Sequence, residues 1–136
     1  MHGLHLTADL SGCPSQRSLF SVPDELRTLC RQAVDGVGLQ AVGELFHRFE
    51  AGGGVTGVLL LAESHLALHT WPELGAVTID VYVCNYSGDN GARAERLMAW
   101  LEAAFEPVRV ERHRLQRGSL AAAASQPAVK ASSNTE

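Results

Sequence analysis

The sequence predicts an α+β fold, a two-layer sandwich in which two helices cover one face of a mostly antiparallel sheet. Short apolar strand-like segments follow one another closely, and only two segments place apolar residues at helical spacing. With 136 residues, 46% of them hydrophobic, the chain is long enough for one core. Because no helix is left for the other face, we expect a second copy of the chain to cover it.

The N-terminal third is expected to form a strand and a helix. Residues 4–10 alternate loosely between apolar and polar, as in a strand. A helix is expected from Pro23, with Ser21 as its N-cap and Gly36 and Gly38 at its end. Its apolar residues share one face, which would pack on the sheet: Leu26, Leu29, Cys30, Ala33, Val34 and Val37.

The middle of the chain changes to the period of strands. We expect strands at 39–49, 55–62, 65–71 and 77–84. Turns are expected at the glycines 52, 53 and 54, and from Pro72 to Gly75. These adjacent runs leave room only for antiparallel connections.

The pattern of the C-terminal part of the chain predicts a second helix and a last strand. After the loop 85–91, Asp89 or Asn90 would cap a helix that Pro107 stops. Its apolar face consists of Ala94, Leu97, Met98, Leu101 and Phe105. A strand is expected at 108–115. The composition then changes to Ala, Ser, Pro and Thr, so we expect one domain at 1–118 and a disordered tail at 119–136.

Composition argues against several classes of protein. The net charge is −4 and Lys and Arg form no cluster, which speaks against a nucleic-acid partner. No signal peptide is recognisable, and the apolar run 58–62 is too short to span a membrane. The odd number of widely spaced cysteines fits reduced thiols in the cytoplasm, with Cys13 and Cys30 as small buried hydrophobes.

The chemical information is concentrated in residues 61–73, Leu-Ala-Glu-Ser-His-Leu-Ala-Leu-His-Thr-Trp-Pro-Glu. A carboxylate, a hydroxyl and two imidazoles stand here in an apolar strand region, where unpaired polar groups cost a few kcal/mol. A metal site at His65 and His69 would lack a third ligand at suitable spacing. Hydrogen-bonded core histidines, or Ser64 as a hydrolase nucleophile without a G-x-S-x-G elbow, each explain only part of the segment.

Five short segments give the chain its resemblance to a known family. They are Phe46-His-Arg-Phe49, Gly54-Val-Thr-Gly57, Ala62-Glu-Ser-His65, His69-Thr-Trp-Pro-Glu73 and Asp80-Val-Tyr-Val-Cys84. Over about residues 3–118 the chain resembles the prokaryotic S-adenosylmethionine decarboxylases. The resemblance implies a pyruvoyl-dependent proenzyme that cuts its own backbone between Glu63 and Ser64, yielding chains 1–63 and 64–136.

The resemblance also implies a role for each residue of the cleavage and of the reaction. Ser64 would attack the carbonyl of Glu63 and convert the amide to an ester, and His69 would assist β-elimination to a pyruvoyl group. The Thr56 hydroxyl, where the family usually carries Ser, would support this processing. The pyruvoyl group would form a Schiff base with the substrate amine and serve as electron sink, without a metal. Cys84 matches the proton donor.

The implied substrate is S-adenosylmethionine, and its decarboxylated product is the aminopropyl donor for spermidine biosynthesis. Phe49 and Trp71 would stack on adenine, although aromatic residues in strands are often core residues. Glu73 would bind the ribose or face the sulfonium, or else be an exposed turn residue. His65 is assigned a positioning role beside the scissile bond.

Two alternatives remain at this point. A related pyruvoyl enzyme would act on another cationic amino acid, ornithine or arginine, and a regulatory paralogue would not cleave at all. The position of His69 also needs explanation, because residues five apart on a strand face opposite sides. A bulge, a twist or a second protomer would have to unite Ser64 and His69, and the resemblance favours a site at the interface of a homodimer or larger oligomer.

Overall fold

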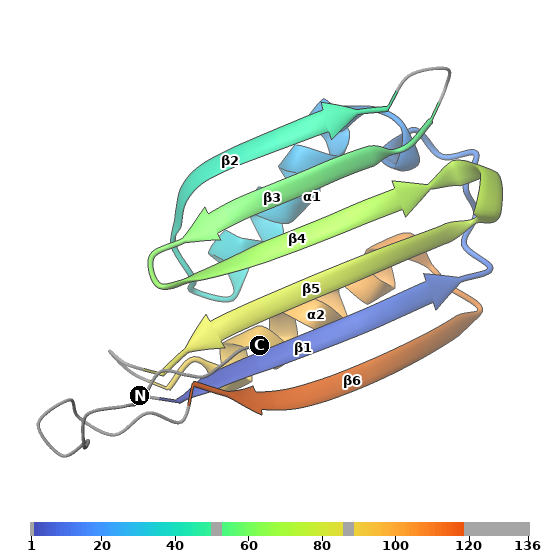
Figure 1. The fold of residues 1–136 in the computed structure, drawn as a ribbon. Helices are drawn as coiled ribbons and strands as arrows, with labels where there is room; N and C mark the ends of the chain where they lie inside the picture. Colours follow the sequence, from blue (N-terminus) through green and yellow to red (C-terminus); the bar gives the residue numbers. More distant parts are fainter. Residues whose placement is uncertain (1, 50–52, 86–88, 119–136) are drawn as a thin grey trace, which may run out of the picture.

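The computed structural model describes residues 2–49, 53–85 and 89–118 (Figure 1). Its elements are β1 Gly3–Ser11, the 3-10 helix η1 Ser18–Phe20, α1 Pro23–Gly36, β2 Ala41–Arg48, β3 Val55–Leu61, β4 Ser64–Trp71, the 3-10 helix η2 Pro72–Leu74, β5 Ala76–Cys84, α2 Gly91–Phe105 and β6 Arg109–Arg117. The predicted strands and helices are confirmed within a few residues. Gly52 of the predicted glycine turn, part of the loop 85–91 and the predicted tail at 119–136 lie outside the described residues.

The six strands form one antiparallel sheet in the order β2-β3-β4-β5-β1-β6. Both helices lie on the same face, α1 behind the β2–β4 half and α2 behind the β5–β1 half (Figure 1). The predicted α+β architecture is therefore confirmed. Within the described part of the chain, neither helix is long and apolar enough to cross a membrane.

The core lies between the sheet and the two helices. Alternate residues of β3, β4 and β5 point toward the helices and are buried, among them Leu59, Leu66, Leu68 and Ile79. Each such side chain contributes about 1.5–3 kcal/mol when it leaves water. The helix residues that the spacing predicted as apolar faces are buried in the same core, except that Leu29 is only partly buried.

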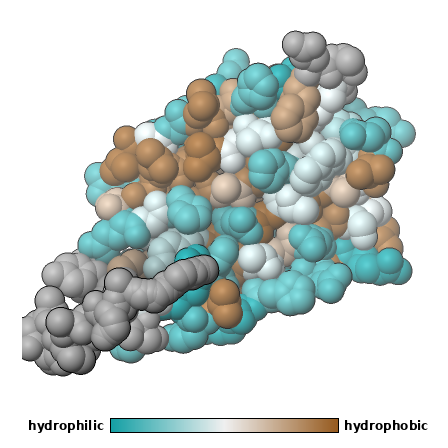
Figure 2. Space-filling model, viewed as in Figure 1, coloured by the Kyte–Doolittle hydropathy of each residue, from teal (hydrophilic) through white to brown (hydrophobic). Residues whose placement is uncertain are grey.

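The opposite face of the sheet is not covered by any described element, and it is divided into two halves. Over β2 and β3 the large apolar side chains Leu45 and Leu60 are 69% and 50% exposed, with the half-buried Val58 and Ala67 beside them. Figure 2 shows this apolar patch over β2 and β3, whereas polar residues dominate over β5, β1 and β6. We call Leu45, Val58, Leu60 and Ala67 the apolar patch.

The predicted N-cap of α1 is wrong, whereas the N-cap of α2 is Asn90, one of the two predicted residues. Ser21 is not the N-cap of α1: its N–H bonds to the Ser18 carbonyl and closes η1, so that Val22 occupies the N-cap position. Ser21 thus ends the short 3-10 helix, although its preference for N-cap positions predicted it at the start of α1. At α2, Asn90 is the N-cap residue without a side-chain capping bond, while Asp89 Oδ1 accepts a bond from the Gly91 N–H at 3.0 Å.

Candidate active site

Thr56 and His69 form a hydrogen-bonded pair on the uncovered face of the sheet. They are direct neighbours across β3 and β4, and the Thr56 Oγ1 lies 3.0 Å from His69 Nδ1. The indole of Trp71 lies beside the imidazole, with ring centroids 5.6 Å apart. The hydroxyl and the neighbouring ring fix the orientation of the imidazole, as a residue that moves protons requires.

The other residues of the motifs around this pair stabilise the local fold by close packing and hydrogen bonds. A Cβ at Gly54 would collide with the Thr70 carbonyl, and one at Gly57 would collide with the Phe46 ring. The buried Thr70 hydroxyl accepts a bond from the Val55 N–H and donates one to the Phe20 carbonyl. The motifs around Thr56 and His69 therefore build the close packing that leaves these two side chains on the uncovered face.

Ser64 begins β4 directly after the two-residue turn that joins it to β3, and it pairs with Leu61. In the next strand pair the register ends at His65, which lies opposite Tyr82, two residues before Cys84. Adjacent strands are about 5 Å apart. Ser64, the first residue of β4, thus lies at the same end of the sheet as Cys84, which ends the neighbouring β5 and is 7% exposed.

A small cavity of about 120 Å³ lies beside Ser64. It is lined by Gly38, Leu39, Gln40, Leu61, Ala62, Glu63, Ser64 and Asn90. Asn90 also donates a hydrogen bond from Nδ2 to the Cys84 carbonyl at 2.9 Å. The half-buried Ser64 therefore has free space next to it and the Cys84 strand end nearby.

One chain does not bring Ser64 and His69 together. Five residues at about 3.3 Å each place them about 16 Å apart along β4. The pairing of β4 with both neighbours runs without a register shift, so no bulge unites them. Among the described residues no group of three His, Cys, Asp or Glu could hold a metal ion.

The other predicted site residues divide between the same two ends of the hairpin. Phe49 follows β2, is 38% exposed, and its N–H bonds to the Gly54 carbonyl at 2.8 Å. Trp71 ends β4 and Glu73 is exposed in η2, so all three lie toward the His69 end. His65 lies at the Ser64 end, with its ring 5.7 Å from that of Tyr82.

Comparison with known proteins identifies the family. The family model described as S-adenosylmethionine decarboxylase matches residues 4–118. The chain belongs to the S-adenosylmethionine decarboxylase family. It is 37% identical over 116 residues to the S-adenosylmethionine decarboxylase proenzyme of Aquifex aeolicus, covering 85% of this chain and 81% of that one.

Further relatives agree. The proenzyme of Picrophilus torridus is 34% identical, with 86% of this chain and 85% of that one covered. The crystal structure of the adenosylmethionine decarboxylase from Aquifex aeolicus superposes with a TM-score of 0.78 at 34% identity, covering 91% of this chain and 97% of that one. The similarity thus spans the whole described domain.

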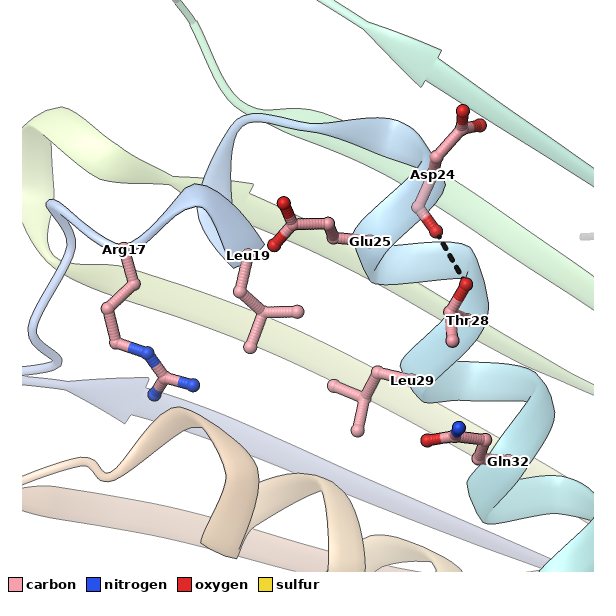
Figure 3. Close-up of a pocket in the computed structure, with 7 residues that line it drawn as sticks. All are labelled: Arg17, Leu19, Asp24, Glu25, Thr28, Leu29 and Gln32. Carbon is pink, nitrogen blue, oxygen red and sulfur yellow. Dashed lines mark hydrogen bonds between the residues drawn. The ribbon is translucent and has the colours of Figure 1, made fainter.

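In this family member a larger open groove, of about 410 Å³, lies elsewhere (Figure 3). It is lined by Arg17, Leu19, Asp24, Glu25, Thr28, Leu29 and Gln32, at the start of α1. The cavity beside Ser64 lies at the other end of α1, next to the residues that follow the helix. Because α1 has 14 residues, its two ends are about 21 Å apart. The groove's charges are also satisfied, Arg17 by the Ala104 carbonyl and Glu25 by the Ser18 hydroxyl. None of the predicted site residues lines this groove.

Two of the three thiols lie outside the site. Cys13 and Cys30 are buried, as expected of small hydrophobic residues. Burial raises the pKa of Cys13, and burial together with the Glu44 carboxylate raises the pKa of Cys30 to about 12. Both therefore stay protonated and unreactive near neutral pH.

Sequence reasoning gave no role to Tyr82 and only a helix cap to Asn90. Tyr82 lies between the rings of His5 and His65, with the Arg117 guanidinium 5.2 Å from its ring centroid. The sequence did contain an indication of a further role for Asn90. Asp89 and Asn90 are both good N-cap residues, but a helix has only one N-cap, so one of the two side chains is available for another contact.

Proposed function

We propose that this chain cuts itself between Glu63 and Ser64 and then decarboxylates S-adenosylmethionine. The observation that carries the proposal is the strand pairing, in which β4 begins at Ser64 beside the end of β5 at Cys84, in a chain of this family. The cut would divide the protein into chains 1–63 and 64–136. The family match ends at residue 118, which supports a domain at 1–118 followed by a separate tail.

The cleavage uses the turn between β3 and β4. Ser64 Oγ attacks the Glu63 carbonyl, the C–N bond breaks, and Glu63 becomes an ester of the Ser64 hydroxyl. His69 then takes the Cα proton of residue 64, Glu63 leaves as a free carboxylate, and residue 64 becomes a dehydroalanine. Its imine tautomer takes up water and releases ammonia, which leaves the pyruvoyl group. Thr56 holds the imidazole through the 3.0 Å contact at Nδ1. A two-residue turn favours the attack because it brings Ser64 and the preceding carbonyl into a confined geometry.

After cleavage, residue 64 is the pyruvoyl group, which supplies an electron sink for the loss of carbon dioxide. The chain's own task is to deliver one proton to the substrate carbon. Cys84 is suited to it, because its thiol is an acid group 7% exposed at the strand end beside residue 64. His65, packed on Tyr82, keeps the start of β4 in place.

A second copy of the chain completes the site. His69 lies about 16 Å from Ser64 along its own strand, so the imidazole that acts on Ser64 comes from the partner. The apolar patch supports this arrangement, because a contiguous exposed apolar surface marks a site of association. A two-fold axis would pair the Ser64 end of each chain with the His69 end of the other, giving two equal sites.

The aromatic residues at the His69 end favour S-adenosylmethionine over ornithine or arginine. Phe49 and Trp71 offer flat surfaces to an adenine ring, which a short aliphatic substrate would not use. Glu73 is an exposed carboxylate at the same end, available for the ribose hydroxyls or the sulfonium. The three free thiols fit a reducing compartment, so we place the enzyme in the cytoplasm.

Intact-mass measurement of the purified protein tests the cleavage. We expect wild-type material to yield a fragment ending at Glu63 and a second fragment with a blocked keto terminus. Ser64→Ala should remain one chain, whereas Ser21→Ala, a serine of the 3-10 turn, should cleave normally. Carbon dioxide release from S-adenosylmethionine, but not from ornithine or arginine, tests the substrate. An uncut wild-type chain after prolonged incubation would refute the proposal.

A further inference from the structure

Asn90 stands at the start of α2, but its side chain does not cap the helix. An Asn at this position normally bonds the N–H two or three residues further on. Here the neighbouring Asp89 accepts the Gly91 N–H, and the Asn90 amide turns to other partners. The preference for Asn at helix starts thus does not account for what this side chain does.

The Asn90 amide is held at both ends. Its Oδ1 accepts a bond from the Arg93 guanidinium at 2.9 Å, and its Nδ2 donates to the Cys84 carbonyl at 2.9 Å. Because arginine only donates, this contact fixes which end of the amide is the oxygen. The Asn90 N–H also donates to Asn85 Oδ1 at 2.9 Å. Asn90 therefore ties the end of β5 to the first turn of α2.

The same residue lines the cavity beside the scissile bond. Glu63, Ser64 and Asn90 all contribute to the walls of that space of about 120 Å³. The pairing of β5 with β4 ends at Tyr82, whereas on its other side Cys84 pairs with Gly3 of β1. The end of β5 is thus held by β1 on one side only, and the bond from Asn90 to the Cys84 carbonyl adds a second attachment.

We propose that Asn90 is a positioning residue that holds the Cys84 strand end against residue 64, so that the thiol meets the substrate carbon. The inference rests on the proposed function, since it takes Cys84 as the proton donor. It assigns part of the placing of that donor to the N-cap side chain of α2, in addition to the pairing of Cys84 with Gly3 in the sheet. Asn90 acts through the Cys84 carbonyl and is not proposed to contact the thiol or the reacting atoms of the scissile bond.

Asn90→Asp is the sharpest variant, because it keeps the shape and the acceptor for Arg93 and replaces the Nδ2 donor by a charged oxygen that cannot bond the Cys84 carbonyl. We expect kcat to fall about tenfold with KM changed less than about twofold, the factor that corresponds to one lost hydrogen bond. The matched control is Asp89→Ala, which removes a bond at the same helix start without touching Cys84. It should leave kcat within about twofold of wild type. Equal kcat in the two variants would overturn the proposal.

A second measurement does not depend on catalysis. In the uncut Ser64→Ala chain, adding Asn90→Asp should speed alkylation of Cys84 by iodoacetamide about tenfold, because the strand end is released. Adding Asp89→Ala should not. Cys13 and Cys30, whose pKa values are raised by burial, serve as slow internal references in the same peptide map. Unchanged alkylation of Cys84 would overturn the proposal.

The two tests separate this proposal from the proposed function. If the wild type fails to cleave, the proposed function fails, while the alkylation result still decides whether Asn90 positions Cys84. If Asn90→Asp does not fold, as judged by loss of self-cleavage in a chain that retains Ser64, then Asn90→Ser takes its place. Its hydroxyl is too short to reach the Cys84 carbonyl, so the same changes in kcat and alkylation are expected.

Discussion

The two ends of the β3–β4 hairpin differ in how their functional groups are held. At the His69 end a single cross-strand pair, Thr56 and His69, is complete within two neighbouring strands. At the Ser64 end the groups come from distant parts of the chain, since Cys84 ends β5 and Asn90 begins α2. The groups at the His69 end are therefore brought together by one hairpin alone. The groups at the Ser64 end come together only when the helices pack on the sheet.

The two ends also differ in exposure. The Ser64 end has a small cavity between the hairpin turn and the helices, and its Cys84 is 7% exposed. The His69 end lies on a face that no described element covers. Excluding water strengthens electrostatic interactions within a site. The proposed second copy of the chain would cover the His69 end and bring it to the cavity beside Ser64.

Mixing two inactive variants gives the largest expected effect. His69→Ala and Ser64→Ala should each remain uncut when expressed alone. In co-expressed chains with different tags, the His69→Ala chain should be cleaved, because its Ser64 meets the partner's intact imidazole. The Ser64→Ala chain should never be cut. If gel electrophoresis shows no cleavage of the mixture, His69 acts within its own chain and the division into two half-sites is wrong.

Charged residues in the apolar patch should dissociate the proposed dimer and so separate the Ser64 end of one chain from the His69 end of the other. The double variant Leu45→Glu and Leu60→Glu would bury carboxylates at the interface, so we expect a monomer in gel filtration and self-cleavage slowed at least about a hundredfold. Val108→Glu is the matched control, since this side chain is 85% exposed and lies away from the patch. A dimer that survives both patch substitutions would place the interface elsewhere.

The Thr56–His69 pair can be tested by its hydroxyl alone. Thr56→Val keeps the shape and removes the partner of His69 Nδ1, so self-cleavage should slow by about tenfold to a hundredfold. Thr56→Ser retains the hydroxyl and should cleave within about threefold of the wild-type rate. Time courses of fragment formation measure both rates. Normal cleavage by Thr56→Val would mean that the imidazole needs no orienting partner.

Substrate stacking gives the smallest expected effect. Trp71→Leu should raise KM for S-adenosylmethionine about fivefold with little change in kcat, since a stacked ring pair is worth about 0.5–1.5 kcal/mol. Trp100→Leu is the control, because this indole lies 42% exposed on α2 beside Gly36. Steady-state kinetics distinguish them. An unchanged KM in Trp71→Leu would leave Phe49 as the only aromatic candidate for the adenine.

The sequence by itself determined the elements and the family. The positions of β1, α1, β5 and α2 follow from periods of two and of about 3.6 residues, which each segment carries on its own. The cap of α1 was wrong because the 3-10 turn at Ser18 competes for Ser21, and nothing local ranks the two. The Glu-Ser-His and His-Thr-Trp-Pro-Glu segments indicated the chemistry without showing how their side chains meet.

Which side chains lie near one another follows only from the fold. The pairing of Thr56 with His69, and the position of Ser64 beside the end of β5, follow from strand register, which is fixed by burying one face of every strand at once. The unbroken register of β4 excluded a bulge and left His69 far from its own Ser64. The link from Asn90 to Cys84 depends on where α2 docks on the sheet. Such contacts depend on packing between segments distant in sequence, which no local pattern encodes.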